Sequence, residues 1–160
     1  EVGKLYKNNK KIYFKLKKIL PNYIHTFPIN KKEITKAILS NNNNFKKIIK
    51  IIHSEIRIKM NIFLKKHKYK KIIILDIPLL LENKINKKKD LLVFVQSKKI
   101  DIKRRLISRP YYNPVLLKKF KNLQLSLDYK KKKSHFIIKN NFTKTSIKKG
   151  IKEILVKLDS

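Results

Sequence analysis

An aspartate at the end of an apolar run is the first residue in this sequence whose type and place could do chemistry. Residues 72–75 are three isoleucines and a leucine, the composition of a buried strand, and Asp76 follows them directly. In open parallel sheets, ligands bind at the carboxyl ends of the strands. A carboxylate placed there could hold Mg²⁺, directly or through water, during phosphoryl transfer, or it could cap a turn or a helix. Glu82 could act in the same way or pair with one of the many lysines.

Arginine is scarce in the chain, which makes each arginine informative. Only four of the 43 Lys and Arg residues are arginine. Arg105 and Arg109 are separated by one helical turn, so a helix would place them on one face. Two guanidinium forks on one face can clamp a polyphosphate and stabilise the charge that develops as a phosphoryl group transfers. The alternative is a surface ion pair between Arg105 and Asp101, but the scarcity of arginine favours a functional role.

Other catalytic patterns are weak or absent in the sequence. His53 lies in an apolar helical segment, where a lone histidine is more often structural than catalytic. Gly3 and Gly150 are the only glycines, so the phosphate loop G-x-x-x-x-G-K-[ST] does not occur in these residues. The sequence has no cysteine, which excludes thiol nucleophiles, zinc–thiolate sites and disulfides within it.

The elements that must position these residues change in type along the chain. The first third has helical spacing, and Asn30 with Glu33 has the pattern of a capping box. Asn113 followed by Pro114 predicts another helix start. The expected helices are 5–20 (ended by Pro21), 30–39, 45–66 after the asparagine run 41–44, 100–109 (ended by Pro110), 114–127 and 146–158.

Three short apolar runs are typical of strands that are covered on both faces. They are residues 72–75, 91–95 and 136–138. Strands that alternate with helices predict a doubly wound α/β fold with a parallel sheet. The helical first third is then predicted to be an insertion beside that sheet.

The charge balance is extreme and admits two interpretations. The formal net charge is +33, which favours attraction to nucleic acid or another polyanion, yet 42% of the residues are hydrophobic, as in a folded domain. Lysine, isoleucine and asparagine all have A/T-rich codons, so nucleotide bias explains much of the composition without selection for binding. No apolar run approaches the roughly 20 residues of a membrane span. The expected compartment is the cytoplasm.

Several motifs, in order, resemble the dephospho-CoA kinase family. Residues 76–82, D-I-P-L-L-L-E, are similar to the family's D-I-P-L-L-F-E segment. The other similar pieces are residues 1–6 (a helix start), 51–57 (the helix of the His-Pro pair), 105–109 (R-L-x-x-R), Gln124 (the lid glutamine) and 136–140 (the strand ending V-I-D-N). Four positions depart from the pattern: Ser54 for proline, Leu81 for phenylalanine, and His135 and Lys139 for acids.

The resemblance implies a P-loop NTPase-type parallel sheet flanked by helices, with a helical acceptor-side insertion and a helical lid. Residues 1–67 would form the acceptor side, 71–98 with 134–160 the nucleotide-binding core, and 104–130 the lid. Family members begin with a strand and a phosphate loop, followed by a second strand that bears an acid. We expect these N-terminal strands upstream of Glu1, and we expect the 160-residue chain alone to be inactive.

The implied reaction is ATP-dependent phosphorylation of the 3′-hydroxyl of dephospho-CoA, with Mg²⁺. On this interpretation the substrates are ATP and dephospho-CoA, with no specific nucleic acid and no membrane partner. The implied site residues are Asp76, Arg105 and Arg109 for catalysis, Asp76 for the metal through water, His53, Pro78, Leu79 and Leu80 for the acceptor, and Arg105, Arg109, Gln124 and Asn140 for the nucleotide and lid. Two other functions remain open: a related nucleoside or nucleotide monophosphate kinase, and a basic nucleic-acid-binding module.

Overall fold

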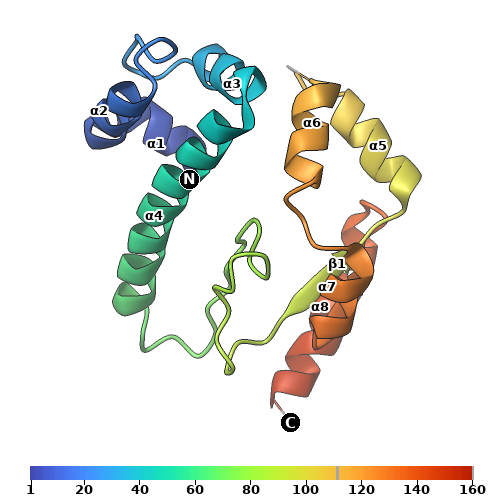
Figure 1. Ribbon diagram of the computed structural model, residues 1–160. Helices are drawn as coiled ribbons and strands as arrows, with labels where there is room; N and C mark the ends of the chain where they lie inside the picture. The colour runs from blue at the N-terminus through green and yellow to red at the C-terminus, as the bar shows by residue number, and fades with distance from the viewer. Residues whose placement is uncertain (111, 160) are drawn as a thin grey trace. The chain divides into compact units, whose positions relative to one another are not determined.

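The structure, a computed structural model, describes residues 1–110 and 112–159. The chain divides into two compact units, Glu1–Asp76 and Ile77–Ser160 (Figure 1). The first unit is entirely helical in its regular structure, and the second combines helices with a small sheet. No described helix is both long enough and apolar enough to cross a bilayer.

Asparagine side chains start three of the four helices of the first unit. These helices are α1 (Val2–Asn8), α2 (Lys10–Ile19), α3 (Lys31–Ser40) and α4 (Asn42–Lys66). The side-chain oxygens of Asn9, Asn30 and Asn41 accept hydrogen bonds from N–H groups in the first turns of α2, α3 and α4, at 3.0, 2.9 and 2.7 Å. Such caps satisfy donors that a helix start leaves open. The prediction of one helix over residues 5–20 is wrong, because Asn9 caps a new helix there. The predicted break over 41–44 shrinks to Asn41 alone.

The main hydrophobic core lies in the first unit. Leu5, Ile12, Leu16 and Ile24 are fully buried, and α2 and α3 both pack against α4. The buried residues of α4 are Asn44, Phe45, Ile48 and Ile52. The apolar periodicity predicted over 45–66 therefore corresponds to buried packing only in the first half of the helix, and Phe63 in its second half is 44% exposed. Glu33 occupies the capping-box position, and its Oε1 accepts a hydrogen bond from the Thr26 hydroxyl at 3.3 Å.

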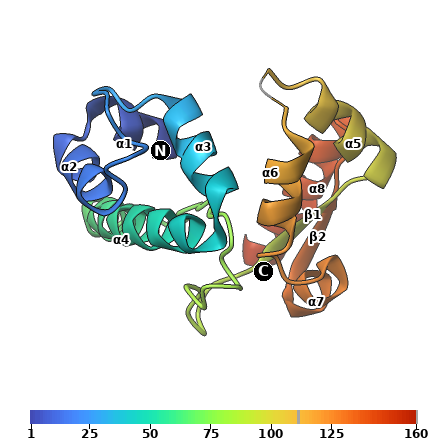
Figure 2. The ribbon, with the colours of Figure 1, turned by 45° about the horizontal axis from the view of Figure 1, so that its top comes forward.

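The second unit contains a two-stranded parallel sheet with helices between and after its strands (Figure 2). In chain order the elements are β1 (Val93–Gln96), α5 (Lys99–Ile107), α6 (Pro114–Lys121), α7 (Leu127–Lys133), β2 (Phe136–Lys139) and α8 (Lys144–Asp159). The strands pair in register from Val93 opposite Phe136 to Gln96 opposite Lys139. Helix α8 packs on β2. The predicted α/β class and the strands 91–95 and 136–138 are confirmed in outline.

Two elements predicted after residue 70, one in each unit, are wrong. Residues 72–75 form no strand, and Ile74 is 86% exposed. The two strands of the described sheet pair with each other, and an apolar run becomes a strand only where a neighbouring backbone takes up its hydrogen bonds. The helix expected over 114–127 ends at Lys121, because Ser126 caps the separate helix α7 by accepting from the Tyr129 N–H at 3.2 Å.

Candidate functional site

The carboxyl ends of β1 and β2 are tied together by a backbone hydrogen bond. The N–H of Asn140, just after β2, donates to the carbonyl of Gln96, the last residue of β1, at 2.7 Å. The Asn140 side-chain oxygen accepts from the Phe142 N–H, also at 2.7 Å. Asn140 therefore shapes the turn at the sheet edge where ligands of open α/β sheets bind.

Phe142 adopts a backbone conformation that bulky residues usually avoid. Its φ angle is 64°, in the left-handed region, which costs an L-residue on the order of 1–2 kcal/mol. The Arg105 guanidinium lies over the Phe142 ring, 4.4 Å from the ring centroid. A cation–π contact at an exposed site contributes roughly 0.5–1 kcal/mol. The turn after β2 thus holds the functional candidate Arg105 in place. Phe142 could not be found from sequence, because an aromatic residue after a strand has no distinctive pattern.

The ion pair proposed as the alternative role of Arg105 is made by another residue. The Asp101 carboxylate pairs with Arg104, at 3.9 Å, while Arg105 faces Phe142. Pairing of Asp101 with Arg104 is an exposed i,i+3 contact of little energetic value. Arg105 therefore does not make the surface ion pair that was the alternative to a functional role.

Arg105 and Arg109 do not share a helix. Helix α5 ends at Ile107, and Arg109 lies in the turn that follows, where its N–H donates to the Leu106 carbonyl at 3.3 Å. The prediction of a helix over 100–109 with both arginines on one face is wrong in this respect. Pro110 is the cause, because the residue before a proline is pushed away from helical backbone angles.

The segment 77–85 is a tight loop pinned by its own polar groups. The Leu79 carbonyl accepts from both the backbone N–H and the side-chain amide of Asn83, at 3.1 and 2.8 Å. Leu79 and Lys84 have φ angles of 57° and 49°. Two strained residues in one short loop are typical of a segment whose shape matters for function. Pro78 is exposed on this loop, and Leu80 is half-buried.

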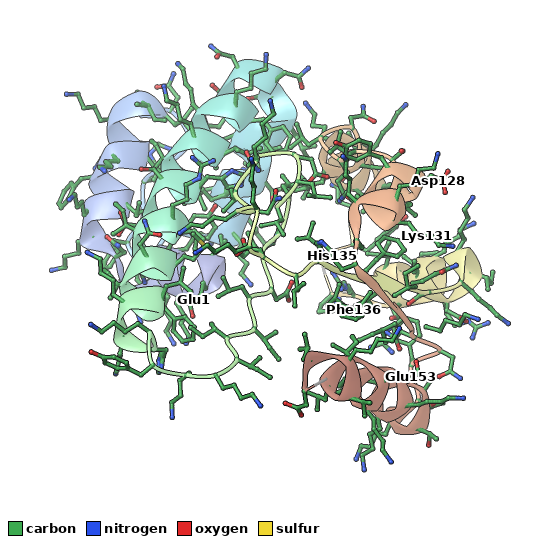
Figure 3. All side chains as sticks on the ribbon, turned by 90° about the horizontal axis from the view of Figure 1, so that it is seen from below. Glu1, Asp128, Lys131, His135, Phe136 and Glu153 are labelled. Carbon is green, nitrogen blue, oxygen red and sulfur yellow. The ribbon has the colours of Figure 1, made fainter. Side chains whose placement is uncertain are left out.

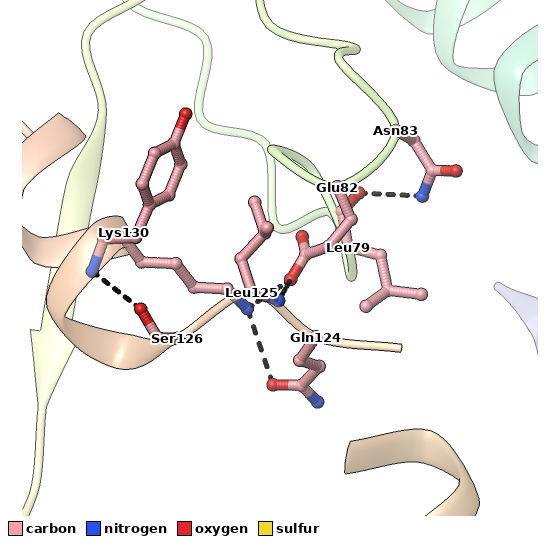
Figure 4. Close-up of polar contacts among 8 residues, drawn as sticks. Leu79, Glu82, Asn83, Gln124, Leu125, Ser126 and Lys130 are labelled. Carbon is pink, nitrogen blue, oxygen red and sulfur yellow. Dashed lines mark hydrogen bonds and ion pairs between the residues drawn. The ribbon is translucent and has the colours of Figure 1, made fainter. Parts of the chain in front are cut away.

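Glu82 connects this loop to the segment before α7 (Figure 4). Its Oε1 lies 2.6 Å from the Lys130 ammonium and accepts the Leu125 N–H at 3.0 Å. Lys130 also donates to the side-chain oxygen of Gln124 at 3.4 Å. Of the two roles open to Glu82, the structure supports the lysine pair. Lys130 could not be found from sequence, because one lysine among so many carries no signal.

The environment of Glu82 keeps it charged. Only 9% of its side chain is exposed, against 19% for Lys130. Burial, the largest single influence, raises the pKa of Glu82, but the hydrogen bonds from Lys130 and from backbone N–H groups, with the charge of Lys130, outweigh burial and hold the pKa below its usual value. Its second oxygen, Oε2, is buried and has no hydrogen-bond partner among the described residues.

A cavity of about 480 Å³ lies beside Glu82, at the amino ends of the strands. Tyr129, Lys133 and His135 line it with Leu92. The backbone of Leu92 donates to His135 Nδ1 at 2.9 Å, just before the two strands begin. His135 stands where the resemblance expects an acid, and here it joins the strand ends through its ring.

Two site candidates belong to the first unit. Asp76 is the last residue of that unit and is exposed, and His53 is half-buried in α4. No group of three or more His, Asp or Glu side chains that could hold a metal occurs among the residues the structure describes. A single carboxylate suits Mg²⁺ that is bound chiefly by substrate phosphates and water, so Asp76 fits a supporting role rather than a complete metal site.

Comparison with known proteins decides the family. The family model described as dephospho-CoA kinase matches residues 4–146, most of the chain. The chain belongs to the dephospho-CoA kinase family. It is 31% identical over 160 residues to the dephospho-CoA kinase of Wolbachia pipientis wMel, an alignment that covers 99% of this chain and 82% of that protein.

Two further relatives of this family agree. The dephospho-CoA kinase of the Wolbachia of Brugia malayi is 27% identical over 156 residues, covering 96% of this chain and 80% of that protein. The dephospho-CoA kinase of Bartonella quintana is 29% identical over 134 residues, covering 78% of this chain and 69% of that protein. The family assignment made from the D-I-P-L-L-L-E segment is confirmed.

Proposed function

We propose that this chain acts in the reaction of its family, the transfer of a phosphoryl group from ATP to the 3′-hydroxyl of dephospho-CoA, which gives CoA and ADP. The observation that carries the proposal is the family match over residues 4–146, which includes the loop 77–85 and both arginines. Neither a monophosphate kinase nor a nucleic-acid-binding module is favoured by that match.

Arg105 and Arg109 are assigned to the phosphates of ATP. A guanidinium fork binds phosphate oxygens through two hydrogen bonds and stabilises the charge that spreads over the transferring group. In support, Arg105 is exposed and held by the Phe142 ring. Arg109 is exposed in a turn after α5, on the segment 104–130 that we propose as the lid. A lid brings such charges in when it closes and excludes water from the transfer.

Asp76 is assigned to Mg²⁺ through water. The ion, when bound with ATP, neutralises charge on the β- and γ-phosphates. Asp76 supports this assignment by its exposure and by its place at the head of the D-I-P-L-L-L-E segment. Glu82 is not assigned this role, because Lys130 and the Leu125 N–H already occupy its Oε1 and its Oε2 is buried.

The acceptor side is assigned to residues 1–67 and the loop after Asp76. His53, Pro78, Leu79 and Leu80 would contact dephospho-CoA, and the strained backbone at Leu79 supports a shaped surface there. The nucleotide-binding core is assigned to residues 71–98 and 134–160. Gln124 and Asn140 complete the nucleotide side, and the bond between Asn140 and Gln96 supports a rigid sheet edge at that place.

Calorimetric titration of the 160-residue chain tests the acceptor. We expect dephospho-CoA to bind, and AMP, which lacks the pantetheine arm, to bind at least about tenfold more weakly, because lost contacts worth 1.4 kcal/mol change affinity tenfold. Equal affinity for the two ligands would favour a monophosphate kinase and overturn the acceptor assignment.

A salt titration separates the proposal from a nucleic-acid-binding function. Side chains with nitrogen tips project from helices of both units (Figure 3), and lysines occur along the whole sequence. We expect DNA affinity to fall to the nonspecific range of roughly 10⁻⁴ to 10⁻⁶ M at physiological salt. Sequence-selective binding that survives at that salt concentration would contradict the proposal.

A further inference from the structure

We propose that Glu82 is a positioning residue for the transfer reaction: it fixes the carboxyl-terminal root of the lid segment 104–130 to the loop 77–85 through Lys130 and Leu125. The inference rests on the proposed function, since it deepens the role of that loop and that segment. Neither the family match nor the resemblance assigns a role to Lys130.

The contacts of Glu82 bracket the start of α7. The Leu125 N–H lies immediately before the capping residue Ser126, and Lys130 lies one turn into the helix. Both donors reach the same oxygen of Glu82, at 3.0 and 2.6 Å. The root of the segment therefore cannot move away from the loop 77–85 without breaking both contacts at once.

The loop end of the connection is equally constrained. The Leu79 carbonyl is bound twice by Asn83, the neighbour of Glu82. Lys130 extends the connection to Gln124, a residue we place on the nucleotide side. Glu82 thus joins an acceptor-side loop to a nucleotide-side residue through one nearly buried ion pair.

Because the Glu82–Lys130 pair is largely buried, loss of one charge should destabilise the protein more than loss of both charges. Removing one partner of a buried ion pair leaves the other charge without compensation, whereas removing both charges avoids that penalty. Glu82→Gln keeps an oxygen for the Leu125 N–H but removes the charge that holds Lys130. Lys130→Met removes the cation but keeps the aliphatic stem. The double variant Glu82→Gln/Lys130→Met should therefore lose less free energy of unfolding than the sum of the losses in the two single variants.

Lysine acetylation tests the connection in the 160-residue chain, without reference to activity. We expect Lys130 to react about tenfold more slowly with acetic anhydride than its exposed neighbours Lys131 and Lys132, because a largely buried, hydrogen-bonded amine must first leave its carboxylate. Glu82→Gln should bring Lys130 to the rate of these neighbours. Asp90→Asn, the same acid-to-amide change nearby, should leave Lys130 slow. Equal rates in the unsubstituted chain, or no response to Glu82→Gln, would overturn the inference.

Steady-state kinetics test positioning. The family's N-terminal strand, glycine-rich phosphate loop and acid-bearing second strand are not among these residues, so all three are supplied ahead of Glu1 for the assay. We expect Glu82→Gln to lower kcat about tenfold with KM for dephospho-CoA changed less than about threefold. Asp101→Asn, an acid-to-amide change outside the ranges assigned to the acceptor side, the core and the lid, should leave both unchanged. If Glu82→Gln speeds the acetylation of Lys130 but leaves kcat unaltered, the positioning role is refuted and the proposed function is not. An unsubstituted protein that forms no CoA would refute the proposed function, and positioning with it, whatever the acetylation result.

Discussion

A methyl group added at Gly150 tests the packing that supports the sheet edge. Gly150 lies in α8 against β2, and a Cβ at this position would meet the side chain of Ile138, at 3.0 Å from Cγ2 and 3.3 Å from Cγ1. Ile138 is 9% exposed and branched at Cβ, so it has little rotamer freedom with which to yield. We therefore expect Gly150→Ala to push α8 away from β2.

Two opposing terms set the magnitude. Alanine in place of glycine within a helix gains up to about 1 kcal/mol in helix propensity. Forcing an extra carbon into a packed contact costs about 1–3 kcal/mol. The net expectation for Gly150→Ala is a loss of roughly 0–2 kcal/mol. Gly3 in α1 has nothing within 4 Å of its added Cβ, so Gly3→Ala should show the propensity gain alone.

Amide hydrogen exchange, followed by mass spectrometry of peptides, measures the two variants locally. Exchange over residues 136–158 should quicken by up to about thirtyfold in Gly150→Ala, since 1.4 kcal/mol corresponds to a factor of ten. Exchange over residues 2–8 should slow in Gly3→Ala. If Gly150→Ala slows exchange in its own segment as Gly3→Ala does, α8 does not pack on β2 as described.

Three further predictions concern local energetics. Burial raises the pKa of Tyr6 to about 12, so the first unit should lose up to about 3 kcal/mol of stability as pH rises from 10 to 12; urea unfolding should show this loss in Tyr69→Phe but not in Tyr6→Phe. The pKa of Glu82 is lowered in the folded state from its usual 4.5, so the stabilisation by its charge is present above about pH 4.5 and is lost as pH falls further. The difference in unfolding free energy between the unsubstituted chain and Glu82→Gln should therefore shrink below about pH 4.5. Asn41→Ala should cost about 1 kcal/mol by removing the α4 cap, whereas Asn43→Ala, at an exposed position in the same turn, should cost nothing; thermal unfolding that ranks them equally would contradict the cap.

Helix starts could be predicted from sequence because their chemistry is local. Asn30 caps α3, and Asn113 with Pro114 starts α6, as expected. Each cap needs only a side-chain oxygen and an N–H two or three residues later. The strands near residues 93 and 136 were also predictable, because short apolar runs bounded by polar residues are typical of buried strands. The family was predictable from one specific segment supported by weaker ones in order.

Contacts between distant residues could not be predicted, because they depend on the fold. Nothing local distinguishes Lys130 from the other lysines as the partner of Glu82, or Phe142 as the ring beneath Arg105. The run 72–75 has strand composition, but a strand also needs a neighbour, which sequence periodicity does not report. The earlier end of helix α5 could have been predicted, because Pro110 disfavours helical backbone angles at Arg109.

Formation of CoA would show directly that this protein transfers a phosphoryl group from ATP to dephospho-CoA. The chain, with the family's N-terminal strand, phosphate loop and acid-bearing second strand supplied ahead of Glu1, is incubated with ATP, Mg²⁺ and dephospho-CoA, and the products are identified by liquid chromatography and mass spectrometry. We expect CoA and ADP in equal amounts, with the new phosphate on the 3′-oxygen. ADP without CoA, or phosphorylation of AMP in preference to dephospho-CoA, would contradict the proposed function.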